Sequence, residues 1–550
     1  MTLRHPSPPA PSPPRPWRQR PRTRRVAAGI AVGGAVVLAL TGCAADGGEP
    51  VVAGPPSVSA SPGMPVGPVP EGLGEFYAQT LTWGDCEKFA VSPDSQQAYA
   101  ADGLECARMT VPLDYAQPAG RQVTVGVLRK AASGARTGSL VVNPGGPGAS
   151  GMGLAADLAS AVAGTPVGEH FDLVGFDPRG VGASEPAVTC LTGPENDARR
   201  ALVDVDTSPA GIARSEQVAK DYANTCADRV GVDVLAHVGT REVVKDMDVL
   251  RSVLGEQKLT YLGYSYGTRI GTAYAEAFPA NVRALVLDGA VDPMADPVQE
   301  LVLQGQGFQG AFDAFVADCV KLSDCPLGPV PEAAVVRYRQ LVNPLVAAPV
   351  TTRDPRGLSY ADSQTGTLQA LYSPQLWSAL RAGLAQLAAG KGDTLLALAD
   401  LYEGRNADGS YNNTNDAFNA IRCVDDPPLT DRATNDAAEA QYRKVAPFLD
   451  DGRATGAAAL DTCAFWRVPA TSTPHPVSAP DLPEVLVIST TGDPATPYAA
   501  GVDLARQLQA RLLSFEGNQH TVALQGQSCV DEVVTAYLED LKLPEEGTRC

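Results

Sequence analysis

Two ingredients of metal sites are scarce in this sequence. No two of its cysteines form a C-x-x-C pair, and its 550 residues include only five histidines, namely His5, His170, His237, His475 and His520. Because zinc sites are built from clustered Cys and His side chains, the sequence predicts no metal site. The same scarcity limits any histidine-dependent chemistry to a few positions.

Positive charge is also in short supply. Seven Arg lie before residue 43 in a stretch without Asp or Glu, and the rest of the chain carries 36 basic residues against 62 acidic ones. Such a surface repels phosphate backbones, so nucleic acid is excluded as an expected partner. It attracts cations, including the protonated amine of a substrate, although solubility outside the cell is the simpler explanation of the charge.

The sequence begins with an apolar run that is too short to span a membrane comfortably. Residues 26–40 are uncharged and apolar, follow an Arg-rich segment, and lead into Leu40-Thr41-Gly42-Cys43. This pattern is typical of a bacterial lipoprotein signal. We therefore expect 1–42 to be a signal peptide and Cys43 to be lipidated. The protein is then exported and anchored on the outer face of the cytoplasmic membrane, or shed from it. An ordinary cleaved signal is the alternative, and Sec and twin-arginine export both stay open.

Ten cysteines remain after Cys43, an even number that suits disulfides in an exported protein. Sequence alone does not fix their connectivity. The simplest proposal pairs nearest neighbours, as Cys86–Cys106, Cys190–Cys226, Cys319–Cys325, Cys423–Cys463 and Cys529–Cys550.

The remaining chain divides by composition. Residues 43–71 are rich in Pro, Gly and Ser, which predicts a flexible linker. Residues 72–292 and 482–550 alternate between strand-like and helix-like segments, which predicts a mostly parallel sheet with helical crossovers. Residues 293–481 instead suggest helices joined by loops. We expect this block to form a cap above the carboxyl ends of the strands, where ligands of open parallel sheets bind.

The predicted strands are short β-branched or apolar runs, and the predicted helices carry an apolar stripe. The strands are 122–128, 139–143, 172–176, 259–263, 282–287, 484–489 and 511–515. The helices are 240–254, 266–278, 499–509 and 529–541, with 308–322 and 376–389 the clearest in the cap.

A G-x-S-x-G motif joins a predicted strand to a predicted helix at Gly263-Tyr264-Ser265-Tyr266-Gly267. In a nucleophile elbow the turn is so tight that side chains two positions before and after the Ser would collide, which explains the glycines. The turn also presents the Ser oxygen at the helix N-terminus. We therefore predict that Ser265 is a nucleophile; the alternative is an incidental Ser in a glycine-rich turn.

A serine nucleophile in this arrangement needs an acid and a base downstream, in that order. His520 lies in a loop after the last predicted strand, whereas His475 lies between prolines ahead of the returning strand. Asp493 follows that returning strand and can orient the imidazole of His520. Asp288, at the end of an earlier strand, is the alternative acid.

Two backbone N–H groups are expected to stabilise an oxyanion. One belongs to Tyr266, and the other is assigned to Gly146, with Gly145 as the alternative, in the loop Asn143-Pro144-Gly145-Gly146-Pro147-Gly148. The glycines also fit a dinucleotide-binding G-x-G-x-x-G motif, with Asp177 as the ribose-binding acid. The proline in that motif removes an N–H from the turn that would hold a pyrophosphate, which argues against this interpretation.

Four motifs together resemble those of secreted tripeptidyl aminopeptidases of high-GC bacteria, which are relatives of proline iminopeptidases within the α/β-hydrolases. They are P-G-G-P-G at 144–148, F-D-P-R-G at 176–180, G-Y-S-Y-G at 263–267 and G-D-P-A-T-P at 492–497. The resemblance spans about residues 76–550. It implies an α/β-hydrolase fold, an acyl-enzyme mechanism without cofactor, and release of short peptides, tripeptides above all, from free N-termini. Pro144 stands where proline iminopeptidases usually have His, which weakens transfer of their single-proline specificity.

An exopeptidase must bind the substrate's ammonium group, and cap carboxylates are the natural means. Asp425 and Asp426 are the candidates, and an acidic loop without this role is the alternative. Thr496 is expected to support the acid loop through a hydrogen bond. A cell-envelope or lipid carboxylesterase using the same triad is the alternative function, and a non-catalytic binding lipoprotein is a third.

Overall fold

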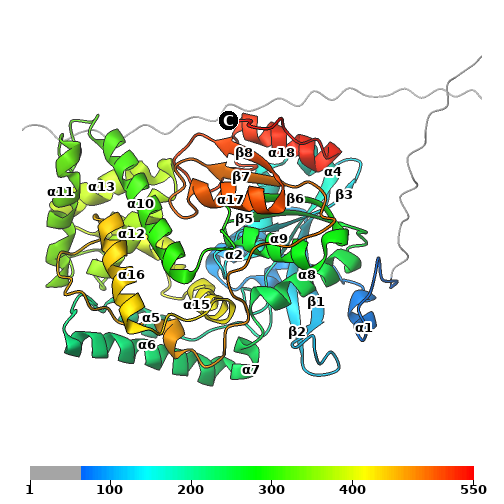
Figure 1. Ribbon diagram of the computed structural model, residues 1–550, viewed down its shortest axis with the longest axis horizontal. Helices are drawn as coiled ribbons and strands as arrows, with labels where there is room; N and C mark the ends of the chain where they lie inside the picture. Colours follow the sequence, from blue (N-terminus) through cyan, green and yellow to red (C-terminus); the bar gives the residue numbers. More distant parts are fainter. Residues whose placement is uncertain (1–62) are drawn as a thin grey trace, which may run out of the picture. The chain divides into compact units, whose positions relative to one another are not determined.

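An eight-stranded sheet is the framework of the computed structural model, which describes residues 63–550 (Figure 1). The predicted signal peptide, Cys43 and most of the linker lie outside the described residues. Within the described range no helix combines the length and the apolar character that crossing a membrane requires. The strand order is β1-β2-β4-β3-β5-β6-β7-β8. β1 and β2 run antiparallel to their neighbours and the other pairs are parallel, which confirms the predicted mostly parallel sheet.

The predicted strands all form, with small changes at their ends. The strands are β1 (Leu104–Pro112), β2 (Gln122–Lys130), β3 (Gly138–Asn143), β4 (Phe171–Phe176), β5 (Leu259–Tyr264), β6 (Val282–Asp288), β7 (Leu486–Thr490) and β8 (Arg511–Phe515). Only β1 was not expected. It is paired along its whole length with β2, so this pairing and not a sequence motif identifies it as a strand.

Helices cover both faces of the sheet. One face packs against α8 (Thr240–Val253), α9 (Tyr266–Ala277) and α17 (Tyr498–Leu508), and the other against α3 (Gly151–Ala161) and α18 (Ser528–Asp540). Strands buried on both sides carry continuous apolar runs and not an alternating pattern, which is why their sequences were recognisable. Short helices complete this half: α1 (Gly74–Tyr77), α2 (Pro93–Tyr99), α4 (Pro166–His170) and α7 (Val232–Leu235).

The cap is helical, as predicted, and has its own hydrophobic core. Its helices are α10 (Pro297–Cys319), α11 (Ala334–Val342), α12 (Tyr360–Leu371), α13 (Trp377–Ala388), α14 (Asp393–Glu403), α15 (Thr414–Asp425) and α16 (Arg432–Val445). Phe312 stacks on Phe448 with ring centroids 4.6 Å apart at the centre of this core. Helix α10 begins earlier than the expected residue 308, because glycines in its first half mask the helical pattern.

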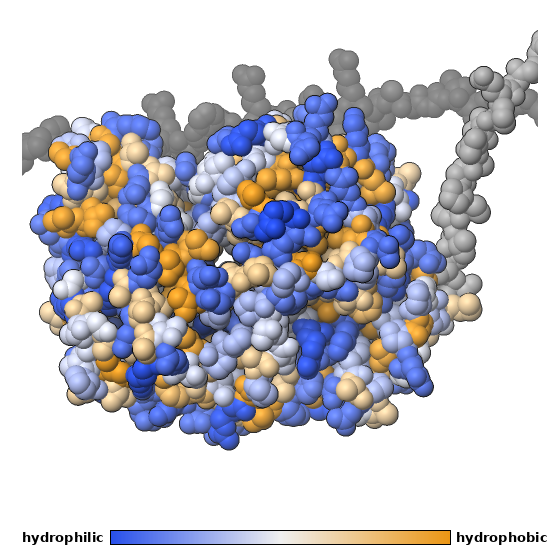
Figure 2. Space-filling model, viewed as in Figure 1, coloured by the Kyte–Doolittle hydropathy of each residue, from blue (hydrophilic) through white to orange (hydrophobic). Residues whose placement is uncertain are grey.

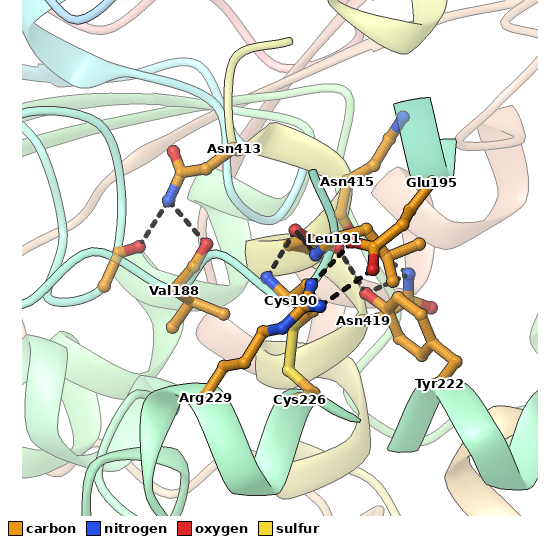
Figure 3. The surroundings of a disulfide bond; sticks show 12 residues. Val188, Cys190, Leu191, Glu195, Tyr222, Cys226, Arg229, Asn413, Asn415 and Asn419 are labelled. Atoms are coloured by element: carbon orange, nitrogen blue, oxygen red, sulfur yellow. Dashed lines mark hydrogen bonds and ion pairs between the residues drawn. A yellow bond between two sulfur atoms is a disulfide. The ribbon is translucent and has the colours of Figure 1, made fainter. Parts of the chain in front are cut away.

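Two helices that precede the nucleophile also pack against the cap. They are α5 (Gly193–Arg200) and α6 (Pro209–Val230), which the sequence assigned to the sheet domain with the rest of 72–292. Arg200 binds Asp362 of α12, at 2.9 Å, and the N–H of Cys190 donates to Asp416 of α15. Figure 3 shows this junction around the disulfide between Cys190 and Cys226. The helical layer is therefore drawn from two stretches of chain, because these partners lie far apart in sequence.

All ten cysteines after Cys43 form disulfides, in the nearest-neighbour pairing proposed from the sequence. Cys319–Cys325 closes the end of α10, and Cys423–Cys463 ties the end of α15 to the chain that returns toward the sheet. Three of the five bonds thus involve the helical layer or its junction with the sheet domain.

Candidate active site

The Ser265 turn has the geometry of a nucleophile elbow. Ser265 connects β5 to α9 with a φ of 55°, a conformation that is unfavourable for a residue with a side chain. A Cβ on Gly263 would lie 2.4 Å from the carbonyl oxygen of Gly267, and one on Gly267 would lie 2.8 Å from that of Asn143. Glycine is therefore required at both positions, for the reason given from the sequence.

His520 and Asp493 form a close pair. The imidazole Nδ1 lies 2.9 Å from both carboxylate oxygens of Asp493, whose side chain is fully buried. The backbone N–H groups of Ala495 and Thr496 donate to the same carboxylate. The Thr496 hydroxyl also lies 3.3 Å from His520 Nδ1, so Thr496 contacts both members of the pair. The expected support from Thr496 therefore includes the base as well as the acid loop.

Asp288, the alternative acid, has a different position. One of its carboxylate oxygens accepts the backbone N–H groups of Val522 and Ala523, at 2.6 and 2.7 Å. It therefore holds the chain just after His520 and does not bond the imidazole in this structure. Its own carbonyl oxygen accepts the N–H of Ser265. Burial raises the pKa of Asp288 to about 6.

The base loop lies against Gly289, which directly follows Asp288, the residue whose carbonyl bonds the elbow. A Cβ on Gly289 would lie 3.3 Å from His520 Cε1, so the imidazole lies directly over this backbone. The hydroxyl of Tyr264, next to the nucleophile, also donates to the carbonyl of Ala523, at 2.7 Å. The folding of the chain thus brings Ser265 and His520 to one corner of the sheet.

The electrostatics of this corner favour a charged imidazole. Burial alone would lower the pKa of His520, but attraction to Asp493 outweighs it and raises the pKa above the ordinary value. The nearby carboxyl of Asp288 acts in the same direction. A protonated His520 is therefore stabilised by its surroundings, as a general base requires once it has accepted a proton.

The glycine loop after β3 lies against the elbow. A Cβ on Gly145 would be 2.7 Å from the backbone nitrogen of Tyr266, so loop and elbow are in contact. The N–H of Gly145 donates to the Asn143 side chain, at 2.9 Å. By contrast, the N–H groups of Gly146 and Tyr266 have no partner among residues 63–550. This favours Gly146 over Gly145 as the second oxyanion donor.

The G-x-G-x-x-G pattern has a packing explanation. A Cβ on Gly151 would lie 2.1 Å from the carbonyl oxygen of Phe176, so helix α3 packs directly on β4. Asp177 is buried and accepts the hydroxyl of Ser150 and the N–H groups of Met152 and Ala183. Its carboxylate therefore braces the turn that follows the glycine loop, and is not available to a ribose.

Asp425 and Asp426 diverge, although they are adjacent. Asp425 is buried, and its carboxylate accepts the N–H and hydroxyl of Thr240 and the hydroxyl of Tyr266. Asp426 is partly exposed and forms a 2.7 Å ion pair with Arg269, one helical turn beyond the nucleophile on α9. Asp425 is therefore an internal tie between cap and elbow, because its donors leave it no free face for an amine. Of the two candidates, Asp426 is the one that solvent can reach.

Glu300, on the first turn of α10, joins Asp426 and Arg269. Its carboxyl is accessible, yet the surrounding protein desolvates it and, together with Asp426, raises its pKa. Figure 2 shows the surface hollowed between the cap and the sheet domain, with apolar side chains on the cap side. Nothing in the sequence marks Glu300, because an acid in the first turn of a helix is common.

The remaining candidate groups that the sequence singled out lie away from the Ser265 corner or have a structural role. Across residues 63–550, no three His, Cys, Asp or Glu side chains gather in a way that could hold a metal ion. His170 binds Glu539 and His475 binds Glu276, both outside the Ser265 corner. Arg179 of the F-D-P-R-G motif is buried and binds both carboxylate oxygens of Asp246, so it stabilises the fold.

Comparison with known proteins agrees with this geometry. A family model described as the alpha/beta hydrolase fold matches residues 138–527. The chain is 51% identical to serine protease Hip1 of Mycobacterium tuberculosis over 479 residues, which cover 86% of this chain and 91% of the relative. Carboxylesterase B of the same species is 48% identical over 513 residues, covering 92% and 96%. Tripeptidyl aminopeptidase of Streptomyces coelicolor is 31% identical over 450 residues, covering 79% and 81%.

Proposed function

The chain belongs to the α/β-hydrolase family and is a serine peptidase, and from this premise we propose that it releases short peptides, tripeptides above all, from free N-termini. The observation that carries the proposal is the pair of solvent-accessible carboxyls, Asp426 and Glu300, beside the Ser265 corner. Negative groups at this place suit the ammonium group of a peptide substrate.

The proposed mechanism uses groups of this chain alone. His520 takes the proton of the Ser265 hydroxyl as the Ser oxygen attacks the peptide carbonyl, and Asp493 stabilises the imidazolium. The N–H groups of Tyr266 and Gly146 hold the oxyanion. His520 then protonates the leaving amine, and water hydrolyses the acyl-enzyme with His520 again as the base.

The ion-pair partner of Asp426 lies on the helix that begins directly after the nucleophile, and this placement supports a short-peptide product. Arg269, the ion-pair partner of Asp426, is one helical turn from Ser265, or about 5.4 Å along the axis. Side chains extend the reach of the pair further, and three extended residues span about 10 Å. An ammonium group held at Asp426 and Glu300 therefore suits a substrate that is cleaved a few residues from its N-terminus.

Three substrates test the proposal on the purified enzyme: a tripeptide amide with a free amine, its N-acetylated form, and a short acyl ester. We expect kcat/KM to be highest for the free amine and to fall by about 10-fold or more on acetylation, since the acetylated nitrogen carries no charge to pair with Asp426 and Glu300. Equal rates with and without the acetyl group would refute the exopeptidase proposal. A marked preference for the ester would favour the carboxylesterase, as the name of one relative suggests.

The variant Ser265→Ala tests the nucleophile itself. We expect it to lose turnover of all three substrates and covalent labelling by a fluorophosphonate, while its thermal unfolding midpoint stays near that of the wild type. Ser252→Ala is a control at a serine remote from the site, and it should be labelled normally. Undiminished turnover by Ser265→Ala would refute the assigned mechanism.

We further propose that the protein is exported and anchored through a lipidated Cys43. The leader pattern supports this, and five disulfides suit an oxidising compartment. The mass of the mature N-terminal peptide from membranes of an expressing bacterium tests the proposal. An acylated Cys43 is expected, and a peptide that begins elsewhere would contradict it.

A further inference from the structure

The cap contacts the loops that carry the acid and the base, and none of these contacts was marked by a motif. His520 lies in the loop after β8, and Asp493 in the loop after β7. Both loops belong to the sheet domain. The end of α12 and the middle of α10, both in the cap, lie directly against them.

The contact with His520 is made by Tyr372, the residue that ends α12. The carbonyl oxygen of Tyr372 accepts the backbone N–H of His520, at 2.9 Å. The Tyr372 ring packs edge-on against the imidazole, with centroids 5.5 Å apart. Phe308 of α10 packs against the same ring at 5.4 Å, so the tyrosine is itself held within the cap. One cap residue thus fixes both the backbone and the ring of the base.

The contact with the acid loop is made by α10, through a glycine. A Cβ on Gly307 would lie 2.5 Å from the carbonyl oxygen of Pro494 and 3.1 Å from that of Asp493. Helix and loop therefore approach each other as closely as their backbones allow. Gly310, one turn further on the same helix, faces open space.

We propose that Tyr372 is a positioning residue for the catalytic base, and that the cap, through Tyr372 and the Gly307 contact, holds His520 and Asp493 in their reactive arrangement. The inference rests on the proposed role of His520 and goes beyond it. The His520 side chain is only 12% exposed, and the Tyr372 ring is part of its cover. Because reacting groups lose rate steeply when they shift, a loop held by the cap reacts faster than a free one.

The first test compares Tyr372→Leu with Tyr372→Phe and Tyr402→Leu. Tyr402 packs against Tyr372, at 6.3 Å, and is itself 41% exposed, so it is a matched tyrosine outside the contact with His520. We expect Tyr372→Leu to lower kcat about 10- to 100-fold, as for a misplaced catalytic group. Tyr372→Phe keeps the ring and should restore kcat to within about threefold of wild type, and Tyr402→Leu should stay in that range.

The substrate in this test is the short acyl ester, because it lacks the ammonium group that the cap carboxyls are proposed to bind. A positioning role lowers kcat for the ester and slows fluorophosphonate labelling of Ser265 by a similar factor, with KM nearly unchanged. If Tyr372 only lined the substrate site, Tyr372→Leu would instead raise KM for peptides and would leave ester turnover and labelling unchanged. Wild-type ester kcat and labelling rate in Tyr372→Leu would overturn the proposal.

The second test moves the cap without touching Tyr372. Gly307→Ala places a methyl group against the Pro494 carbonyl, whereas Gly310→Ala adds the same methyl group in open space on the same helix. Both changes raise helix propensity equally. We expect Gly307→Ala to lower ester kcat at least 10-fold and Gly310→Ala to leave it unchanged. Equal kcat in the two variants would overturn the proposal, even if Tyr372→Leu fails to fold.

Failure of this inference is distinguishable from failure of the proposed mechanism. If Ser265→Ala abolishes turnover but the Tyr372 and Gly307 variants behave as their controls, the nucleophile stands and the cap has no positioning role. If Ser265→Ala keeps its turnover, the proposed mechanism fails first.

Discussion

The sheet domain carries its candidate catalytic groups on four loops that the sequence marks, whereas the cap touches the same four loops through residues that no motif marks. Gly148 of the glycine loop packs against the backbone of α15, and Asp425 of that helix binds the hydroxyl of Tyr266 at the elbow. Gly307 and Tyr372 meet the acid and base loops. The comparison suggests a division of labour, in which one half supplies reacting groups and the other fixes where they stand.

The sharpest way to break this comparison is to replace, one at a time, the two buried carboxylates that contact His520 or the chain just after it, Asp493 and Asp288. Asp493→Asn should lower kcat about 10⁴-fold, because an amide no longer holds the imidazole in the required tautomer. Asp288→Asn should cost less than about 10-fold, since Asp288 bonds the backbone at 522–523 and not the ring. Ester kcat for both variants decides between them.

Circular dichroism of both variants checks that the fold is kept. An equal loss of ester kcat in Asp493→Asn and Asp288→Asn would show that contact with the His520 ring does not distinguish the catalytic acid.

The adjacent cap acids allow a second, smaller test. Asp425→Asn should reduce the free energy of unfolding by about 2–3 kcal/mol, because a buried carboxylate with three donors is replaced by a group that cannot accept them all. Asp426→Asn removes a partly exposed ion pair and should cost under about 1 kcal/mol. Urea titration of the two variants measures the difference.

Substrate selectivity should distinguish Asp425 from Asp426 in the opposite order, with the larger effect at Asp426. Asp426→Asn should raise KM for the free-amine tripeptide amide and leave the acyl ester unchanged. If Asp425→Asn does this and Asp426→Asn does not, the assignment of the amine site is wrong.

The smallest expected effect is on the pH profile, which reports on His520, the sheet-domain residue that the cap contacts through Tyr372. The base must be neutral to accept a proton, and the raised pKa of His520 keeps it protonated to higher pH than an ordinary imidazole. The acid limb of kcat/KM should therefore lie above the ordinary imidazole value of about 6.5. A limb at or below the ordinary value would contradict the pairing with Asp493.

Most of the sheet and its site could be predicted because their signals are local. Ser265 needs glycines two positions away on either side, and Asp493 and His520 each lie in a loop that follows a short strand. Tyr372, Gly307 and Glu300 gave no such signal. Their roles depend on what the fold brings beside them, and a tyrosine or glycine in a helix is ordinary without that neighbour.

The pairing of β6 with β7 places strands side by side that are separated in the chain by the whole cap. During synthesis the elbow is therefore complete long before Asp493 and His520 leave the ribosome. A chain that stops short of its last seventy or so residues has the attacking alcohol but nothing to take its proton.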